Sequence, residues 1–483
     1  MKNKLLNDEN IDDFINRLTE SVFKSSIEKG NLISWELFFD ELFMDDEIIH
    51  INNTGAIALG ISALCNSNKK DNQYREIIKK ASDLLINLRN KDGSWSVTSN
   101  TSDSDNVGVV YNSVIAIQSL VDAGFLNINE TEPDQLNNNL DYIFDSIKWI
   151  YSQRIEKSVN DVQYYGWGYS GEAENKIYIM PTINVLITLK KIYYELAKVW
   201  KNQIHKEVQD NKDLLTIINE IQDSVYSFRI SPDEGWGKEI NENKDRIVYT
   251  LYGLYGLSYS DAEVEGIDEY PSEKLNDSDV NIFTKMICRW NQKKCFEGNF
   301  LDSLNPEEFY DSYIQKGSSA LNEIIDHESF FEAIAIISIV GFVKRYRKRI
   351  KKSNQGQLFQ IIVKLCASLR RRICVISIKD VSFTVVRSRR GLLSQSYPIY
   401  AITQSTNALL TLKNEKKTIN KLMNYQSSIY KVVGFIIQSI ALFLVNRVAI
   451  READVLTLVF VSLIAPLSEY IKNWIFSFSN LED

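Results

Sequence analysis

The sequence predicts an all-helical protein, with a closed ring of six helix pairs over residues 1–415 and a hydrophobic helical hairpin over residues 416–483. Three observations support this fold class. The chain has 7 prolines in 483 residues, and runs of alternating β-branched residues are few. A short apolar helical pattern recurs six times along the first four hundred residues. Two apolar runs lie near the C-terminus.

The recurring pattern is a small residue (once Val) next to an aliphatic residue, usually with another aliphatic three positions on. Because each copy is apolar on nearly every face, we expect six buried helices. The copies are TGAIALGI (Thr54–Ile61), SVIAIQSL (Ser113–Leu120), TINVLITL (Thr182–Leu189), TLYGLYGL (Thr250–Leu257), FFEAIAII (Phe330–Ile337) and STNALLTL (Ser405–Leu412).

Amphipathic segments alternate with these buried ones. REIIKKASDLLINLRN (Arg75–Asn90) and LDYIFDSIKWIYSQR (Leu140–Arg154) have the apolar spacing of helices with one wet face. Six inner helices would then surround an axis, and six outer helices would face water. Stacking of the same hairpins into an open solenoid is the alternative.

Loops with Gly beside or near Trp precede three of the buried segments. They are NKDGSW (Asn90–Trp95), YGWGYSGEAEN (Tyr165–Asn175) and DEGWGKEINENKD (Asp233–Asp245). Glycine supplies a turn that other residues resist, and the indole packs against helix ends. We expect these tryptophans to be structural and not ligand contacts.

In these turns the chain resembles the terpenoid cyclase and protein prenyltransferase superfamily, with its prenyltransferase and squalene oxidase repeats. The resemblance covers roughly residues 40–415 and implies an α6/α6 toroid. The Gln that precedes the turn in the family is absent: Asn87 and Arg89 stand near its place. Repeats one, five and six lack the Gly–Trp turn.

The residues for zinc chemistry, which the prenyltransferases of this superfamily use, are missing. No cysteine has Asp two positions before it, and His50, His205 and His327 do not have metal-ligand spacing. We therefore predict no metal and no cofactor.

The class II cyclases of the superfamily protonate their substrate with the middle Asp of an Asp-x-Asp-Asp run. The resemblance would make Asp105 of Asp103-Ser104-Asp105-Asn106 the catalytic acid and Asp103 its partner. Asn106 replaces the last Asp, and the run lies six residues too early for the family's register. The alternative is a solvated loop that caps the following helix.

A ring of apolar helices also implies a central apolar cavity suited to an apolar ligand. The aromatic residues that would line it, or alternatively fill the centre, are Tyr111, Tyr178, Tyr249, Tyr252, Phe330 and Phe331.

The two C-terminal apolar runs, Val432–Val445 and Val455–Leu467, predict a membrane-associated hairpin. Each is shorter than the ~20 residues that cross a bilayer, but the flanking residues bring each run close to that length. Three arrangements remain open. The hairpin could span the membrane, which we favour, dip into it, or pack on the ring.

Charge is divided along the chain. Residues 1–330 carry 32 basic and 55 acidic groups (net −23), whereas residues 331–483 carry 23 and 8 (net +15). Basic segments within 343–391 stand before the hairpin, as expected of contacts with anionic lipid. The predicted lipid contacts are Lys344, Arg345, Arg347, Lys348, Arg349, Arg370, Arg371 and Arg372. We expect no nucleic-acid partner, because two thirds of the chain is acidic.

The predicted location rests on the N-terminus, the cysteines and the predicted hairpin. The N-terminus, MKNKLLNDENIDDF, lacks the apolar core of a signal peptide, and the five cysteines contain no Cys-x-x-Cys pair. We expect reduced thiols and a ring on the cytoplasmic side of a bacterial inner membrane. A homo-oligomer is left open.

Two functions follow. We favour a membrane-associated ring that binds an isoprenoid, lipid or other apolar ligand without catalysis, as in a bacterial stress or anti-phage effector. The alternative is an active class II-like terpenoid cyclase that acts on a polyprenyl substrate.

Overall fold

A computed structural model gives the fold of most of the chain. It describes residues 8–36, 53–67, 71–97, 107–127, 133–159, 162–169, 176–199, 204–240, 242–243, 245–260, 269–293, 295–296, 310–314, 324–328, 331–390 and 394–422. This part is mostly helical, which confirms the predicted helical character.

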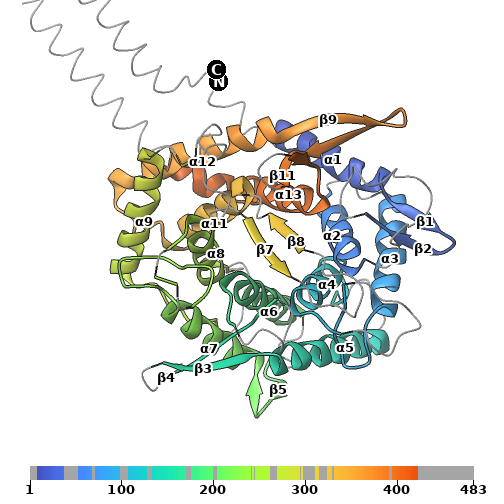
Figure 1. Cartoon of the computed structure of the whole chain (residues 1–483), viewed down its shortest axis with the longest axis horizontal. Helices are drawn as coiled ribbons and strands as arrows, with labels where there is room; N and C mark the ends of the chain where they lie inside the picture. The colour runs from blue at the N-terminus through green and yellow to red at the C-terminus, as the bar shows by residue number, and fades with distance from the viewer. Residues whose placement is uncertain are drawn as a thin grey trace, which may run out of the picture.

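Six helices of this part pack on one another in cyclic order (Figure 1). Each contacts the next, and the last contacts the first, so they form a closed inner ring. The inner helices are α2 (Thr54–Cys65), α4 (Val110–Asp122), α6 (Ile179–Val199), α8 (Ile247–Ser258), α11 (Phe331–Tyr346) and α13 (Ile399–Asn414).

A second set of helices lies outside this ring (Figure 1). Each has one apolar face toward the inner ring and one polar face toward solvent, as its amphipathic sequence predicts. The outer helices are α1 (Asp8–Lys24), α3 (Asn72–Asn87), α5 (Pro133–Ser152), α7 (Leu214–Ser227), α9 (Asp277–Gln292) and α12 (Lys352–Arg372).

The described residues of the six apolar segments lie on the inner helices, and outer helices stand between them along the chain. The identification of this ring as an α6/α6 toroid of a known family stays a prediction. The domain boundary at residue 415 also stays a prediction. Helix α13 ends at Asn414, residues 416–422 are again helical, and the predicted hairpin lies outside the described residues.

The expectation of helices alone needs one correction, because short antiparallel hairpins join several of them. Each described sheet has two strands. In the pair with the longest strands, the alternating apolar sequences ICVISI and VSFTVV favour strands directly after Arg372, the last residue of α12. The pairs are β1–β2 (Ile27–Lys29, Leu32–Ser34), β3–β4 (Ile155–Val159, Val162–Gly166), β5–β6 (Glu207–Gln209, Lys212–Asp213), β7–β8 (Tyr310–Ile314, Ile324–Glu328), β9–β10 (Ile373–Ile378, Val381–Val386) and β11–β12 (Ser388–Arg390, Ser394–Ser396).

Buried tryptophans join outer helices to inner ones. The indole Nε1 of Trp95, Trp167 and Trp236 each donates to a backbone carbonyl near the end of the preceding outer helix, at 2.7 Å. The peptide N–H of each tryptophan donates to a hydroxyl in the following inner helix. We call these three sets of hydrogen bonds the tryptophan bridges. The carbonyls belong to Leu85, Ile150 and Val225, and the hydroxyls to Ser113, Thr182 and Thr250.

A fourth tryptophan extends this pattern to the first repeat. The Trp35 indole donates to the Val22 carbonyl of α1 at 2.8 Å, and its side chain is 1% exposed. Sequence analysis missed this residue because no glycine stands beside it. The inner-helix position that carries a hydroxyl in the other three repeats is Ile57 here, four residues after Asn53.

Ring closure joins the first and last inner helices. The Thr403 hydroxyl of α13 donates to the Leu59 carbonyl of α2 at 3.1 Å, and the Asn66 amide donates to Asn407 Oδ1 at 2.7 Å. Outside them, α1 packs on both α13 and α2. The N-terminal helix therefore covers the seam at which the ring closes.

Glycine is needed where the Trp236 indole packs against the inner helix α8. A Cβ on Gly253 of α8 would lie 2.5 Å from Trp236 Cδ2. The indole is fixed by its bond to Val225 and by stacking on Phe283 of α9, with ring centroids 5.4 Å apart. These two contacts hold the indole in place, so it cannot easily shift to make room for an added methyl group.

We therefore expect Gly253→Ala to lower the free energy of unfolding by about 1–3 kcal/mol, as overpacking of a core does. The matched control is Gly341→Ala in α11, where an added Cβ meets nothing within 4 Å. The control should be neutral or stabilising by up to about 1 kcal/mol, because alanine favours a helix. Urea unfolding of both variants measures the difference, and equal effects would contradict the close packing.

Candidate functional site: a polar cavity at the centre of the ring

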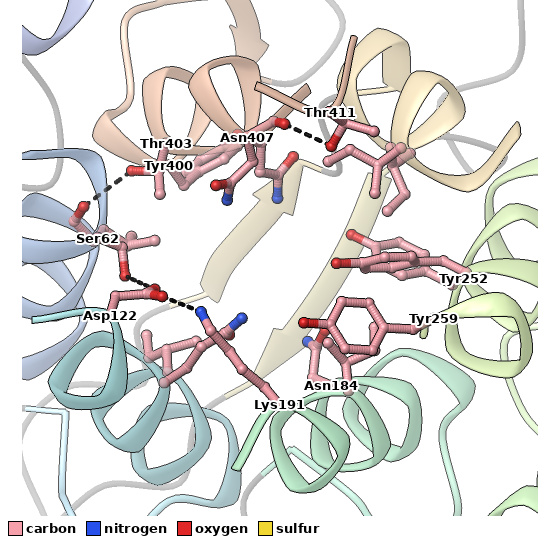
Figure 2. A pocket seen from close by; sticks show the side chains of 18 of the residues that line it. Ser62, Asp122, Asn184, Lys191, Tyr252, Tyr259, Tyr400, Thr403, Asn407 and Thr411 are labelled. Atoms are coloured by element: carbon pink, nitrogen blue, oxygen red, sulfur yellow. Dashed lines mark hydrogen bonds and ion pairs between the residues drawn. The ribbon is translucent and has the colours of Figure 1, made fainter. Parts of the chain in front are cut away.

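Within the described part of the chain, the inner ring surrounds a cavity of about 290 Å³, and each of its helices contributes to the wall (Figure 2). The wall contains hydroxyls, amides and one oppositely charged pair besides aliphatic groups. It is therefore more polar than the apolar space that the sequence predicted.

Helix α13 lines the cavity along its whole length. Its lining residues recur every three or four positions, so they form one stripe on one helix face. The stripe consists of Tyr400, Thr403, Gln404, Asn407, Leu410, Thr411 and Asn414.

A chain of polar contacts connects three inner helices at the cavity wall (Figure 2). Asp122 of α4 accepts a hydrogen bond from the Ser62 hydroxyl of α2 at 3.2 Å and pairs with the Lys191 ammonium of α6. Ser62 and Asp122 lie in the C-terminal halves of their helices, and Lys191 lies just past the middle of α6, as expected when neighbouring inner helices run in the same direction. The side chains of Lys191 and Asp122 are 20% and 23% exposed, which makes the pair half-buried.

The adjacent lysine has a structural role. Lys190 is 1% exposed and donates to the backbone carbonyls of Gly256 at 2.8 Å and Tyr259 at 3.3 Å. These carbonyls end α8, where helix geometry leaves them without intrahelical partners. Burial, followed by the positive charge of Arg345, lowers the pKa of Lys190 well below its ordinary value. Lys190 therefore joins α6 to α8, whereas Lys191 faces the cavity.

Tyrosines supply the aromatic part of the wall. Tyr111, Tyr252, Tyr255, Tyr259 and Tyr400 all line the cavity. Burial raises the pKa of Tyr111 and of Tyr255, and the neighbouring Tyr252 adds to both shifts. These two phenols are therefore neutral at physiological pH and can both donate and accept hydrogen bonds.

The predicted aromatic set is only partly gathered here. Tyr111 and Tyr252 line the cavity, whereas Tyr178, Tyr249 and Phe331 are described but are not among its lining residues. Tyr178 packs on Tyr169 with ring centroids 5.1 Å apart, and Phe331 stacks on Phe296 at 6.1 Å. Phe330 lies outside the described residues, so its predicted contact with a ligand stays a prediction.

The predicted acids, Asp103 and Asp105, also lie outside the described residues. The carboxylate that the described cavity wall does contain, Asp122, was not predicted. Across the described residues, no three His, Cys, Asp or Glu side chains come together as a metal site would require.

The predicted lipid contacts fall into two groups, one just before the start of α12 and one in its last turn. Lys344 and Arg345 lie in the last turn of α11, and Arg347, Lys348 and Arg349 lie between α11 and α12. Arg370–Arg372 end α12. A helix of 21 residues separates the groups by about 30 Å.

Several of these cations already have carboxylate partners. Lys344 pairs with Glu415 at 2.7 Å, Arg349 with Glu273 at 3.0 Å, and Arg372 with the buried Glu332 at 3.2 Å. Lys348, Arg370 and Arg371 are exposed. Within the described part of the chain, no helix combines the length and the apolar composition that a membrane crossing requires.

Comparisons with known proteins leave the family open. No protein-family model and no curated protein matches the chain. A solved structure described as a novel alpha-amylase from Clostridium perfringens is similar, with 13% sequence identity and a TM-score of 0.45. The match covers 82% of this chain and 97% of the other. A likeness this low carries no argument about fold or activity.

The Asp122–Lys191 pair gives a test of the cavity wall. Lys191→Met leaves a half-buried carboxylate without its cation, so we expect the free energy of unfolding to fall by about 1–3 kcal/mol. The control is Lys198→Met on the same helix, because Lys198 pairs with Glu195 at 2.9 Å with both side chains nearly 40% exposed. It should cost less than about 0.5 kcal/mol. Equal losses in urea unfolding would show that Asp122 and Lys191 do not interact as described.

Proposed function

We propose that this protein is a non-catalytic α6/α6 toroid that binds a small molecule in its central cavity and transmits the bound state to a membrane-associated C-terminal segment. One observation carries the proposal. Helix α13 supplies a full-length stripe of the cavity wall, and the chain continues from it into the predicted hairpin.

The toroid is supported by the cyclic packing of the inner helices and by the tryptophan bridges. In each bridge a loop tryptophan connects an outer helix to the next inner one, which fits a repeated helix pair. The contacts between α13 and α2 favour a closed ring over an open solenoid, because the terminal repeats of a solenoid would not touch.

A binding function is favoured over catalysis by the use of the cavity carboxylate. An acid that protonates an alkene must carry a proton and stand free to donate it. Asp122 instead accepts from the Ser62 hydroxyl and pairs with Lys191. The cyclase alternative depends on Asp103 and Asp105, and no described contact favours it.

The membrane part of the proposal is supported by the position of the residues that follow α13. Glu415 pairs with Lys344, so the residues that lead into the predicted hairpin start beside the basic end of α11. Lys348 and Lys352 are exposed near this end. Anionic lipid would be attracted to these cations and would orient the ring on the cytoplasmic face of a bacterial inner membrane.

A soluble ligand-binding ring joined to an apolar hairpin is a layout suited to a stress or anti-phage effector. Binding in the cavity would change the interactions of α13 and thereby the position of the segment that follows it. The sequence predicted an isoprenoid, lipid or other apolar ligand. The amides and the charged pair of the wall favour a ligand that also carries polar groups.

The test compares three forms of the full-length chain expressed in bacteria. The unchanged chain should enter the membrane fraction and, on expression, depolarise the membrane and arrest growth. A form with polar residues through Val432–Leu467 should stay out of the membrane fraction and should cause neither depolarisation nor growth arrest. Asn184→Trp fills the cavity and should alter depolarisation while the protein still reaches the membrane fraction.

The matched control is Lys198→Trp, on an exposed part of the same helix, which should behave as the unchanged chain does. Circular dichroism confirms that each variant is folded. The proposal would be lost if the protein stayed soluble regardless of residues 425–483, or if Asn184→Trp and Lys198→Trp behaved alike.

A further inference from the structure

We infer that the ligand of the central cavity is a neutral, hydroxyl-rich molecule of about the size of a mono- or disaccharide. This inference rests on the proposed binding function and names the chemistry of its ligand.

The charge of the wall excludes a strongly charged ligand. Among the described lining residues, the charged side chains are Asp122 and Lys191, and they neutralise each other. A phosphate or a lone ammonium would therefore enter a half-buried site without a free counter-ion, which carries a desolvation cost.

The amides of the wall disfavour a hydrocarbon. Within the described part of the chain, the side chains of Gln118, Asn184 and Asn414 have no hydrogen-bond partner. Each amide offers two N–H donors and an acceptor oxygen. An isoprenoid would cover these groups and leave them unpaired, whereas a ligand hydroxyl both donates and accepts.

Asn407 presents the same chemistry from the opposite side of the cavity. Its Oδ1 accepts from Asn66, which fixes the orientation of the amide. Figure 2 shows Asn407 on α13 and Asn184 on α6 facing the same space. Hydroxyls at several positions of one ligand can therefore be bonded at once.

The charged pair suits adjacent hydroxyls. A carboxylate has about four acceptor sites and an ammonium three donors, so their mutual contact and the Ser62 bond leave capacity on both. One hydroxyl of a vicinal diol can donate to Asp122 while its neighbour accepts from Lys191. The pair need not separate.

Size and aromatic character agree with this ligand class. A cavity of about 290 Å³ stands at the lower end of the range for small-molecule sites, roughly 300–1,000 Å³. The rings of Tyr111, Tyr252 and Tyr400 offer apolar faces against which the C–H groups of a sugar ring can pack.

The experiment titrates the full-length protein with defined probes by calorimetry. The neutral probes are glucose, maltose, trehalose and myo-inositol; farnesol is the apolar probe, and glucose 6-phosphate is the charged one. We expect at least one neutral probe to bind with a Kd below 1 mM and more tightly than farnesol or glucose 6-phosphate. Asn184→Leu and Gln118→Leu should each weaken it at least tenfold, whereas Lys198→Met should not change it.

Two results would overturn the inference while leaving the proposed function intact. In one, farnesol or glucose 6-phosphate binds more tightly than every neutral probe, and Asn184→Trp abolishes that binding. In the other, no neutral probe binds with a Kd below 1 mM, but mass spectrometry finds a charged or apolar small molecule that copurifies with the unchanged chain and not with Asn184→Trp. If nothing copurifies and no probe binds, both the inference and the proposed function fail.

Discussion

The structure depends on the hydrogen bond from a buried indole to the last turn of an outer helix. At a helix C-terminus the carbonyls lack the i+4 partner of the helix interior; those of Ile150 and Val225 accept from the backbone N–H of Gln153 and Phe228, and a buried end gains from a further donor. Trp95, Trp167 and Trp236 supply it, and their own peptide N–H groups reach a hydroxyl of the next inner helix. One residue, through its indole and its peptide N–H, thus fixes how an outer helix ends and where the following inner helix begins.

Repetition of this bridge places the inner helices in the same direction around the axis, and that orientation creates the cavity. Ser62, Asp122 and Lys191 are separated by 60 and 69 residues along the chain, yet they meet because each lies in the C-terminal half of its helix. The same alignment brings Lys190 to the carbonyls that end α8. The polar wall therefore follows from the bridges, since helices of mixed direction would scatter these side chains between the two ends of the ring.

The buried inner helices could be predicted from the sequence, because they are apolar enough to be recognised as buried. The missed features are those in which a single residue departs from the pattern. Trp35 forms its indole bond without a neighbouring glycine, so the Gly–Trp signal could not find it. The polar lining was present in the same segments that were interpreted as apolar: Gln118 in SVIAIQSL, Asn184 in TINVLITL and Asn407 in STNALLTL. A lone amide in a helix buried on every side has a cost unless something bonds it, and this was the available signal.

Helix α13 has two roles in the ring. It closes the ring through Thr403 and Asn407, and it lines the cavity with the stripe that contains them. Its end is held by ion pairs from Lys413 to Asp12 and from Lys344 to Glu415, just before the chain continues toward the apolar C-terminal runs. A ligand bonded to the stripe must change the free energy of the contacts that close the ring, because the same side chains and their neighbours make both. Under the proposed function, ligand binding and the placement of the C-terminal segment would be coupled through α13 without any need for a longer pathway.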